Sequence, residues 1–346
     1  MGYRATVAAA FIACAIALLM LLMLVTGSPP LGGVRALVNG SIGSWYAFTS
    51  STLVRSVPLL LAGGGVAIAF RAGVFNIGAE GQLLVGASAA AALGLWLPHG
   101  GWITTTLALV AGALAGAFWA GIAAYLRERF AVLEVISTIM LNFVALYGIS
   151  YLVRGPLQEP THAYPQSSAV AESVRLSHLP WAGRLHTGFV LALALLIFAG
   201  WVMRHTAIGF RMLAVGENPF AAASAGQIDV PLSVRHAFLA SGGLAGLAGA
   251  VEVFGVTYSL YEDLSPGYGY SAIAVALLAG LDPWRVIPAA LLFGALESGG
   301  AAMQRDVGIP ATLVTVVEAS LILVLLLLRN RLGRRASARV LEQAAT

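Results

Sequence analysis

The sequence contains no lysine: all 19 of its basic residues are arginine. Without lysine, the chain has no residue for the phosphate-binding position of a P-loop and none that could form a Schiff base. We therefore expect that this chain does not itself hydrolyse ATP by the P-loop route. Charge is scarce in general, since only 10% of the 346 residues are charged, whereas soluble domains carry about 25%.

Cysteine and metal-binding patterns are also scarce. The one cysteine, Cys14, can form no internal disulfide, and we expect it to pack inertly in an apolar run. None of the six histidines shows H-E-x-x-H or another metal spacing. No nucleophile set is visible either, so the sequence predicts no catalytic residues, no metal and no cofactor, and the chain is not expected to be an enzyme.

Long apolar runs dominate what is present, and 59% of the residues are hydrophobic. A membrane-spanning helix needs roughly 20 apolar residues to cross about 30 Å of hydrocarbon. The runs predict an all-α integral membrane protein with about ten transmembrane helices, at about 6–25, 52–70, 77–97, 102–126, 132–153, 187–203, 236–256, 270–281, 286–303 and 311–328.

The arginines predict how the helices are oriented. Cytoplasmic loops of membrane proteins carry the excess of basic residues. With both chain ends in the cytoplasm, most arginines fall inside, including a cluster after the last run, and no nucleic-acid partner is needed to explain the net charge of +4. The arginines expected inside are Arg4, Arg71, Arg127, Arg129, Arg204, Arg211, Arg235, Arg285, Arg329, Arg331, Arg334, Arg335 and Arg339.

Two segments do not fit a regular span. Tyr270–Leu281 covers about 18 Å as a helix, which is too short to cross alone. It is either a half-helix or a helix extended by the irregular backbone of 264–269. Arg71–Gly81 is broken by several glycines. Short or glycine-broken segments at membrane depth point to a translocation path, because irregular backbone is tolerated there only inside protein or beside water.

Small residues and acids within the runs leave alternatives open. Gly112-x3-Gly116 and Gly242-x3-Gly246 allow helices to approach closely, either inside one bundle or at a subunit interface. Acids within membrane helices face the interior or a polar cavity. They are either structural or the members of a polar pathway or a proton relay; the candidates are Glu80, Glu252, Glu297 and Glu318.

The polar loop at about 204–235 predicts a short capped helix. Asn218 is a good N-cap and Pro219 suits the first helical position. Phe220–Ala225 favours a helix, and Gly226 can end it in a left-handed conformation. Such a helix projecting from a membrane bundle suits docking on another protein, whereas the alternative is a helix lying on lipid.

Three separated motifs carry a family resemblance. Residues 71–83 (RAGVFNIGAEGQL), 214–222 (AVGENPFAA) and 274–294, with Asp282-Pro283, resemble the permease subunits of ABC importers for ribose-type sugars, nucleosides and branched-chain amino acids. The resemblance covers about 50–328. The segment 76–82 looks most like one of the two unlike permeases of nucleoside importers.

The resemblance implies a type II-like permease bundle with a cytoplasmic coupling helix, in a bacterial inner membrane. The implied partners are an ABC ATPase subunit, a second and unlike permease, membrane lipid, and a binding lipoprotein or periplasmic protein that delivers a small polar substrate. Coupling to the ATPase would fall on Glu217, Asn218, Pro219, Phe220, Ala221 and Ala222. Our candidates for the translocation path are Phe75, Asn76, Glu80, Asn142 and Phe143.

We therefore expect one transmembrane permease domain over 1–335, with an outer loop at about 154–186, followed by a cytoplasmic tail at 336–346. The function expected is translocation of nucleosides or related solutes into the cytoplasm, driven by a separate ATPase. The alternatives are a sugar or branched-chain amino acid permease of the same kind, and a proton-coupled secondary transporter.

Overall fold

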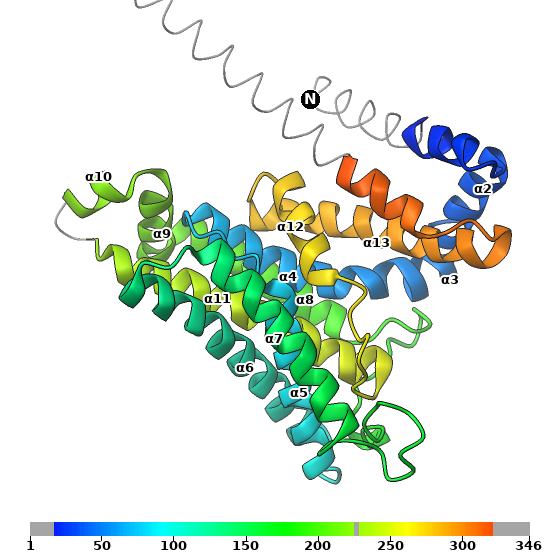
Figure 1. Ribbon diagram of the computed structural model, residues 1–346, viewed down its shortest axis with the longest axis horizontal. Helices are drawn as coiled ribbons and strands as arrows, with labels where there is room; N and C mark the ends of the chain where they lie inside the picture. Colours follow the sequence, from blue (N-terminus) through cyan, green and yellow to red (C-terminus); the bar gives the residue numbers. More distant parts are fainter. Residues whose placement is uncertain (1–16, 225–227, 321–346) are drawn as a thin grey trace, which may run out of the picture. The chain divides into compact units, whose positions relative to one another are not determined.

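The computed structural model describes residues 17–224 and 228–320, which fall into two compact units. We call them unit 1, with residues 17–47 and 296–320 of the described chain, and unit 2, Phe48–Ala295. The described residues are helical, with no strand among them beyond isolated bridges (Figure 1). The single domain expected over 1–335 stays a prediction, and Cys14, Gly226 and the C-terminal arginines lie outside the described residues.

Unit 1 is built around a small apolar core. It contains α2 (Pro30–Ser41), α3 (Trp45–Ala47), the end of α13 (Pro283–Val307) and a helical stretch at 312–320. Its core includes Leu19, Met23, Met303 and Val314. The Ser298 hydroxyl donates to the Gly40 carbonyl at 3.0 Å, which fastens α13 to α2.

Unit 2 holds the remaining elements (Figure 1). They are η1 (Phe48–Leu53), α4 (Val54–Arg71), α5 (Ala79–Trp96), α6 (Gly101–Phe130), α7 (Glu134–Arg154), η2 (Glu172–Val174), α8 (Gly188–His205), α9 (Ala207–Glu217), α10 (Pro219–Ser224), α11 (Val230–Glu252), η3 (Val253–Thr257), α12 (Tyr268–Leu278) and the start of α13.

Glycines allow α11 to lie directly against α5 and α6. A Cβ on Gly246 would collide with the backbone of Gly112 and Gly116 on α6, and a Cβ on Gly86 of α5 would collide with the backbone of Gly246. A Cβ on Gly242 would likewise meet the backbone of Gly116. The two small-residue motifs therefore face each other inside one bundle, which decides between the alternatives that the sequence left open.

Six described helices are long and apolar enough to span a membrane, so the predicted class is confirmed. They are Trp45–Arg71, Gly101–Phe130, Glu134–Arg154, Gly188–His205, Val230–Thr257 and Pro283–Val307. The predicted third span is present as α5, but Glu80 and Gln82 in its first turn lower its mean hydropathy. Most of the predicted first span and part of the tenth lie outside the described residues, so the number ten stays a prediction.

The predicted short segment is a short helix in the structure as well, and we call α12 the half-helix. α12 begins only at Tyr268, and the residues before it form an irregular loop, 258–267. From Leu278 back to Gly269 the helix covers about 14 Å. Because the hydrocarbon layer is about 30 Å thick, a helix that starts at one face and runs this far ends near the middle.

Candidate functional site

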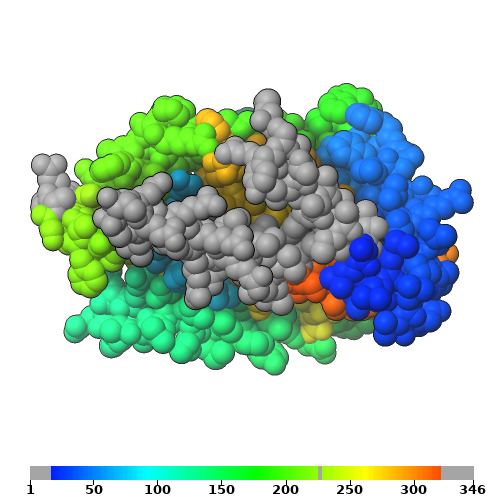
Figure 2. Space-filling model, turned by 90° about the horizontal axis from the view of Figure 1, so that it is seen from above, coloured from blue at the N-terminus to red at the C-terminus, as the bar shows by residue number. Residues whose placement is uncertain are grey.

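The two ends of unit 2 differ in character. At one end, called the arginine-rich end, α4, α6 and α8 finish together with α9 and the start of α11, and Ile68, Ala124, Met203, Met212 and Phe238 share a core there. The other end, called the loop end, carries the segments 155–187 and 258–267. α9 and α10 lie at one extremity of unit 2 in both views (Figures 1 and 2).

The predicted helix cap is confirmed. The Asn218 side-chain oxygen accepts the backbone N–H of Phe220 and of Ala221, both at 3.0 Å. This oxygen partners two amides that the first turn of a helix otherwise leaves free. Asp229 caps α11 in the same way, since its carboxylate accepts the Leu232 N–H at 2.9 Å.

The predicted coupling residues are divided by exposure. Glu217, Asn218, Pro219, Phe220 and Ala221 are exposed, and the Phe220 side chain is exposed to 85%. Ala222 is buried, with 5% exposed. A large exposed ring on a short helix is an apolar anchor without a partner among the described residues. The packing of Ala222 belongs to the chain's own fold.

α9 fastens this segment to the bundle, and the sequence reasoning missed it. Thr206 caps α9 by accepting the Gly209 N–H at 3.2 Å, and Met212 and Val215 are buried. Near its end, Gly216 lies so close to the backbone of Arg71 and Ala72 that a Cβ would collide with both. The signals available in the sequence were the threonine cap and the apolar spacing of Met212 and Val215.

A buried polar network joins the segment after α4 to three helices. The amides of Asn76 and Gln82 donate to each other at 2.9 Å, and Asn76 also donates to the Ser241 hydroxyl at 2.9 Å. The Asn142 side-chain oxygen accepts the Gly81 N–H at 2.8 Å, and its amide donates to the Ile77 carbonyl at 2.9 Å. The irregular backbone of 72–78 is thus satisfied inside protein, as membrane depth requires.

Glu80 meets the start of the half-helix. Its carboxylate accepts the Gly269 N–H at 2.7 Å and a hydrogen bond from Ser265. A carboxylate is stabilised at a helix N-terminus by the helix dipole and the free amides. Asn142 also lies 3.4 Å from the Tyr270 hydroxyl. The structure therefore brings Asn76, Glu80 and Asn142 together around one polar region.

The two aromatic residues predicted for the path are exposed, unlike the three polar ones. Phe75 is 53% exposed and Phe143 is 48% exposed, so both are available at the surface of unit 2. Asn76, Glu80 and Asn142 are buried and hydrogen-bonded. The polar members therefore position α12 and the 72–78 segment, and only the aromatic pair and Tyr270 offer surface. Gln82, Ser241 and Tyr270 were missed, because nothing in the local sequence marks their long-range contacts.

The other acids expected in a polar path fall into separate units. Glu252 is buried in unit 2, whereas Glu297 and Glu318 belong to unit 1. Glu318 Oε1 has no hydrogen-bond partner among the described residues, and Glu297 acts on Glu318 electrostatically.

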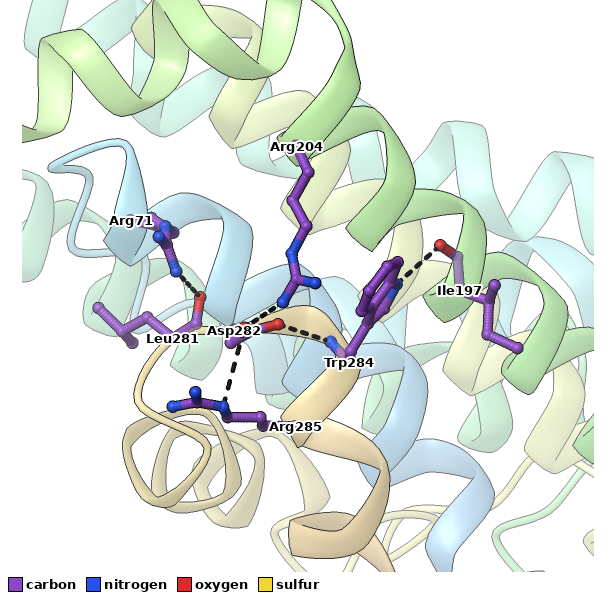
Figure 3. Close-up of polar contacts among 7 residues, drawn as sticks. All are labelled: Arg71, Ile197, Arg204, Leu281, Asp282, Trp284 and Arg285. Carbon is purple, nitrogen blue, oxygen red and sulfur yellow. Dashed lines mark hydrogen bonds and ion pairs between the residues drawn. The ribbon is translucent and has the colours of Figure 1, made fainter. Parts of the chain in front are cut away.

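A cluster at the arginine-rich end surrounds Asp282, as Figure 3 shows. Arg204 Nη2 lies 2.5 Å from Asp282 Oδ2, and the Trp284 N–H donates to Asp282 Oδ1 at 3.0 Å. The Arg204 guanidinium also stacks over the Trp284 ring at 3.8 Å. The sequence indicated Asp282-Pro283 only through the family resemblance and gave no sign of the partner on α8.

At the loop end, backbone hydrogen bonds join the segments 155–187 and 258–267. Ser167 N–H donates to the Leu260 carbonyl, and Val170 N–H to the Tyr258 carbonyl, both at 2.8 Å. Arg154 pairs with Glu262 at 2.6 Å, and Ser150 also hydrogen-bonds to Glu262. The hydrogen bonds from Arg154 and Ser150 lower the pKa of Glu262 to about 2.

Together, a bundle of membrane-length helices, a polar region around a half-helix, and a projecting capped helix define a membrane transport subunit. The chain belongs to the family described as the branched-chain amino acid transport system / permease component, whose model matches residues 48–329. It is thus a multi-pass permease of the ABC transporter type, a membrane component and not an enzyme.

Three of the relatives that match most of the chain illustrate the resemblance. The guanosine ABC transporter permease protein NupP of Bacillus subtilis is 38% identical, over 88% of this chain and 87% of its own. The glucose ABC transporter permease protein TsgB13 of Haloferax volcanii is 38% identical, over 80% and 75%. The nucleoside ABC transporter permease protein NupB of Lactococcus lactis is 31% identical, over 87% and 85%.

Proposed function

We propose that this chain is the permease subunit of an ATP-driven importer that carries nucleosides into a bacterial cytoplasm. The observation that carries the proposal is the capped helix α10, whose Phe220 side chain is exposed. The preceding helix, α9, packs through Gly216 against Arg71 and Ala72, just before the polar region. An ATPase that moves α10 would thereby act on 72–78 and α12. Such rigid-body movement is how packed elements switch between discrete states.

The substrate class rests on the relatives. Two of the three are named for guanosine or nucleosides. The third is named for glucose at the same identity as the first, so a sugar is the second candidate. Exposed aromatic rings such as Phe75, Phe143 and Tyr270 suit stacking on a base or on a sugar face.

The orientation proposed is that the arginine-rich end faces the cytoplasm, with both chain termini on that side. Arg71, Arg127, Arg204 and Arg235 all lie at this end, which agrees with the positive-inside rule. It is also the end that carries α10, where an ATPase would dock. The loop end would then meet a binding lipoprotein or periplasmic protein.

The partners proposed are an ABC ATPase subunit, a second and unlike permease, and that binding protein. Glu217, Asn218, Pro219, Phe220, Ala221 and Ala222 form the proposed coupling segment. Phe75, Asn76, Glu80, Asn142 and Phe143 are proposed to line or position the path, with the three polar residues acting through α12.

The test of substrate class is ligand-stimulated ATP hydrolysis by the complex of this chain with its ATPase, second permease and binding protein. We expect nucleosides to stimulate hydrolysis at micromolar concentration, and glucose, ribose and leucine not to do so. Stimulation by a sugar alone would replace the nucleoside assignment with the second candidate.

Docking through Phe220 has its own test. Burying a phenylalanine side chain contributes about 1.5–3 kcal/mol, so Phe220→Ala should weaken ATPase binding by about tenfold to hundredfold. The fold should persist, because the ring is exposed. Ser224→Ala, on the same helix and also exposed, is the matched control. Equal ATPase affinity for both variants would contradict docking at this ring.

A further inference from the structure

The turn between α12 and α13 has a backbone that needs support. Gly280 and Leu281 both adopt left-handed conformations, with φ of +64° and +62°. For a leucine this conformation is unfavourable, so it persists only where surrounding contacts hold it. Arg71 Nη1 donates to the Leu281 carbonyl at 3.5 Å, which brings the end of α4 onto the turn.

Asp282, the next residue, holds the turn to α8. Its carboxylate binds Arg204 at 2.5 Å and accepts the Trp284 N–H at 3.0 Å. Arg285 lies farther away, at 3.9 Å. The Asp282 side chain is only 12% exposed, so water screens this ion pair less than it screens a surface pair.

Trp284 makes a second connection to α8. Its indole N–H donates to the Ile197 carbonyl at 3.1 Å, and Arg204 stacks on its ring (Figure 3). The ring also lies directly against Gly200, where a Cβ would collide with it. Arg204 thus contacts both Asp282 and Trp284 at once, which favours arginine over lysine at this position.

The position of Arg204 in the chain gives the contact its significance. It lies in the last turn of α8, just before Thr206 caps α9, and α9 leads directly into α10. At its far end α9 packs Gly216 on Arg71 and Ala72. The α9–α10 segment is therefore attached to the bundle at two points. One point is the backbone of Arg71 and Ala72, before the polar region. The other is Asp282, just after the C-terminal end of α12.

We propose that Arg204 and Asp282 are positioning residues that transmit movement of the α9–α10 segment to the half-helix α12. The proposal rests on the proposed function. α12 is held at both ends. Asp282 holds its C-terminal end, and the contact of Glu80 with Gly269 holds its N-terminal end. A shift of α8 and α9 would thereby be delivered to the middle of the membrane as a movement of one short helix.

The test is uptake per ATP hydrolysed in proteoliposomes that hold the full complex. We expect Arg204→Ala and Asp282→Asn each to lower this ratio at least tenfold, while ATPase binding and the basal rate of hydrolysis stay near wild type. The double variant should be no worse than Arg204→Ala alone, because that variant already removes the ion pair with Asp282 as well as the stacking on Trp284. Arg204→Lys should recover part of the ratio, since it keeps the charge and loses the stacking.

Arg235→Ala is the matched control. Arg235 forms an ion pair with Glu128 at 2.7 Å at the same end of unit 2, but this pair joins α11 to α6 and does not touch α12. Its ratio should stay within twofold of wild type. The inference is overturned if Arg204→Ala and Asp282→Asn also stay within twofold, or if Arg235→Ala falls equally. If wild-type complex shows no ATP-driven uptake at all, the proposed function itself fails.

A second measurement follows α12 directly. With Cys14→Ser as background, Tyr270→Cys reports on the start of α12, where Tyr270 is partly exposed. We expect ATP to change its rate of thiol labelling at least threefold in the otherwise wild-type complex and to have no effect when Arg204→Ala is added. An equal response to ATP with and without Arg204 would contradict transmission through this contact, even where the variants reduce uptake.

Discussion

The Asn218 side chain caps α10, as its position in the sequence predicted. Its oxygen satisfies two amides of α10, and losing such a cap costs about 1 kcal/mol. We therefore expect Asn218→Ala to speed hydrogen exchange at Phe220 and Ala221 by roughly fivefold, as that free energy implies. Asn218→Asp keeps the acceptor and should leave exchange unchanged. Equal protection in all three proteins would rule out the cap.

His186 is a side chain whose environment opposes charge. It is fully buried against Gly188 and Gly255, and neither ring nitrogen has a hydrogen-bond partner among the described residues. Burial, helped by the nearby His178, lowers the pKa of His186 from 6.5 to about 4. The unfolded chain therefore binds this proton first as the pH falls.

The consequence is a stability that depends on pH. The contribution of a neutral His186 is complete above about pH 6.5 and is lost as the pH falls toward about 4, to the order of 3 kcal/mol. Thermal unfolding in detergent should show this loss in wild type. His186→Phe, which keeps a flat ring and cannot titrate, should flatten the dependence between pH 6.5 and 4. An unchanged slope in that variant would place the titrating group elsewhere.

The sequence therefore predicts contacts between residues close together in the chain, but not contacts between residues far apart in it. The Asn218-Pro219 cap involves neighbours within three residues, so the sequence alone indicates it. Asn76 with Ser241 and Arg204 with Asp282 join residues far apart in the chain, and their partners depend on how the helices pack. Asn76, Glu80 and Asn142, which were predicted for the path, are buried and hydrogen-bonded in the structure, and their role in the path stays a prediction.

Among the helices, the contact of α11 with α5 and α6 depends on the absence of side chains. A Cβ on Gly246 would collide with the α6 backbone at Gly112 and Gly116, whereas at Gly243 the nearest atoms, on Ala113 and Ala117, lie 3.6 and 3.8 Å away. We expect Gly246→Ala to destabilise the protein by about 1–3 kcal/mol, as overpacking does. Gly243→Ala should be neutral or slightly stabilising, because alanine is the better helix former.

Thermal unfolding of these two variants in detergent provides the comparison. Both substitutions add one methyl group to the same helix three residues apart, so they differ only in what the methyl group meets. A Gly243→Ala protein as unstable as Gly246→Ala would mean that the helix surface, and not the close approach, is sensitive to the change.

The half-helix α12 was predictable because of its length, and its attachments were not. An apolar run too short to cross the bilayer, preceded by Ser265, Pro266 and Gly267, indicates broken backbone at depth. That Glu80 would meet its start follows only from packing. α9 was not predicted, because it is only 11 residues long and lies within a polar stretch of the sequence.

For the molecule as a whole, the proposed orientation can be tested without any substrate. In a Cys14→Ser background, Ala223→Cys on α10 and Thr161→Cys in the loop after α7 are both at exposed positions. An impermeant thiol reagent added outside whole cells should label Thr161→Cys and should label Ala223→Cys only after the membrane is opened. The reverse pattern would invert the proposed topology.

The absence of a P-loop lysine is consistent with a permease subunit that works with a separate ATPase. The chain has no lysine for a P-loop, and its relatives are permease components, so the energy must come from another subunit. The alternative of a proton-coupled carrier needs a continuous relay of acids. Within unit 2, the Glu80 carboxylate is already held by Gly269 and Ser265 as a structural contact.

The most direct test of the account is nucleoside uptake into proteoliposomes that contain this chain with its ATPase, second permease and binding protein. We predict uptake when ATP is supplied on the side of the arginine-rich end, and none when a proton gradient is applied without ATP. Uptake driven by the proton gradient in vesicles that lack the ATPase would contradict the account.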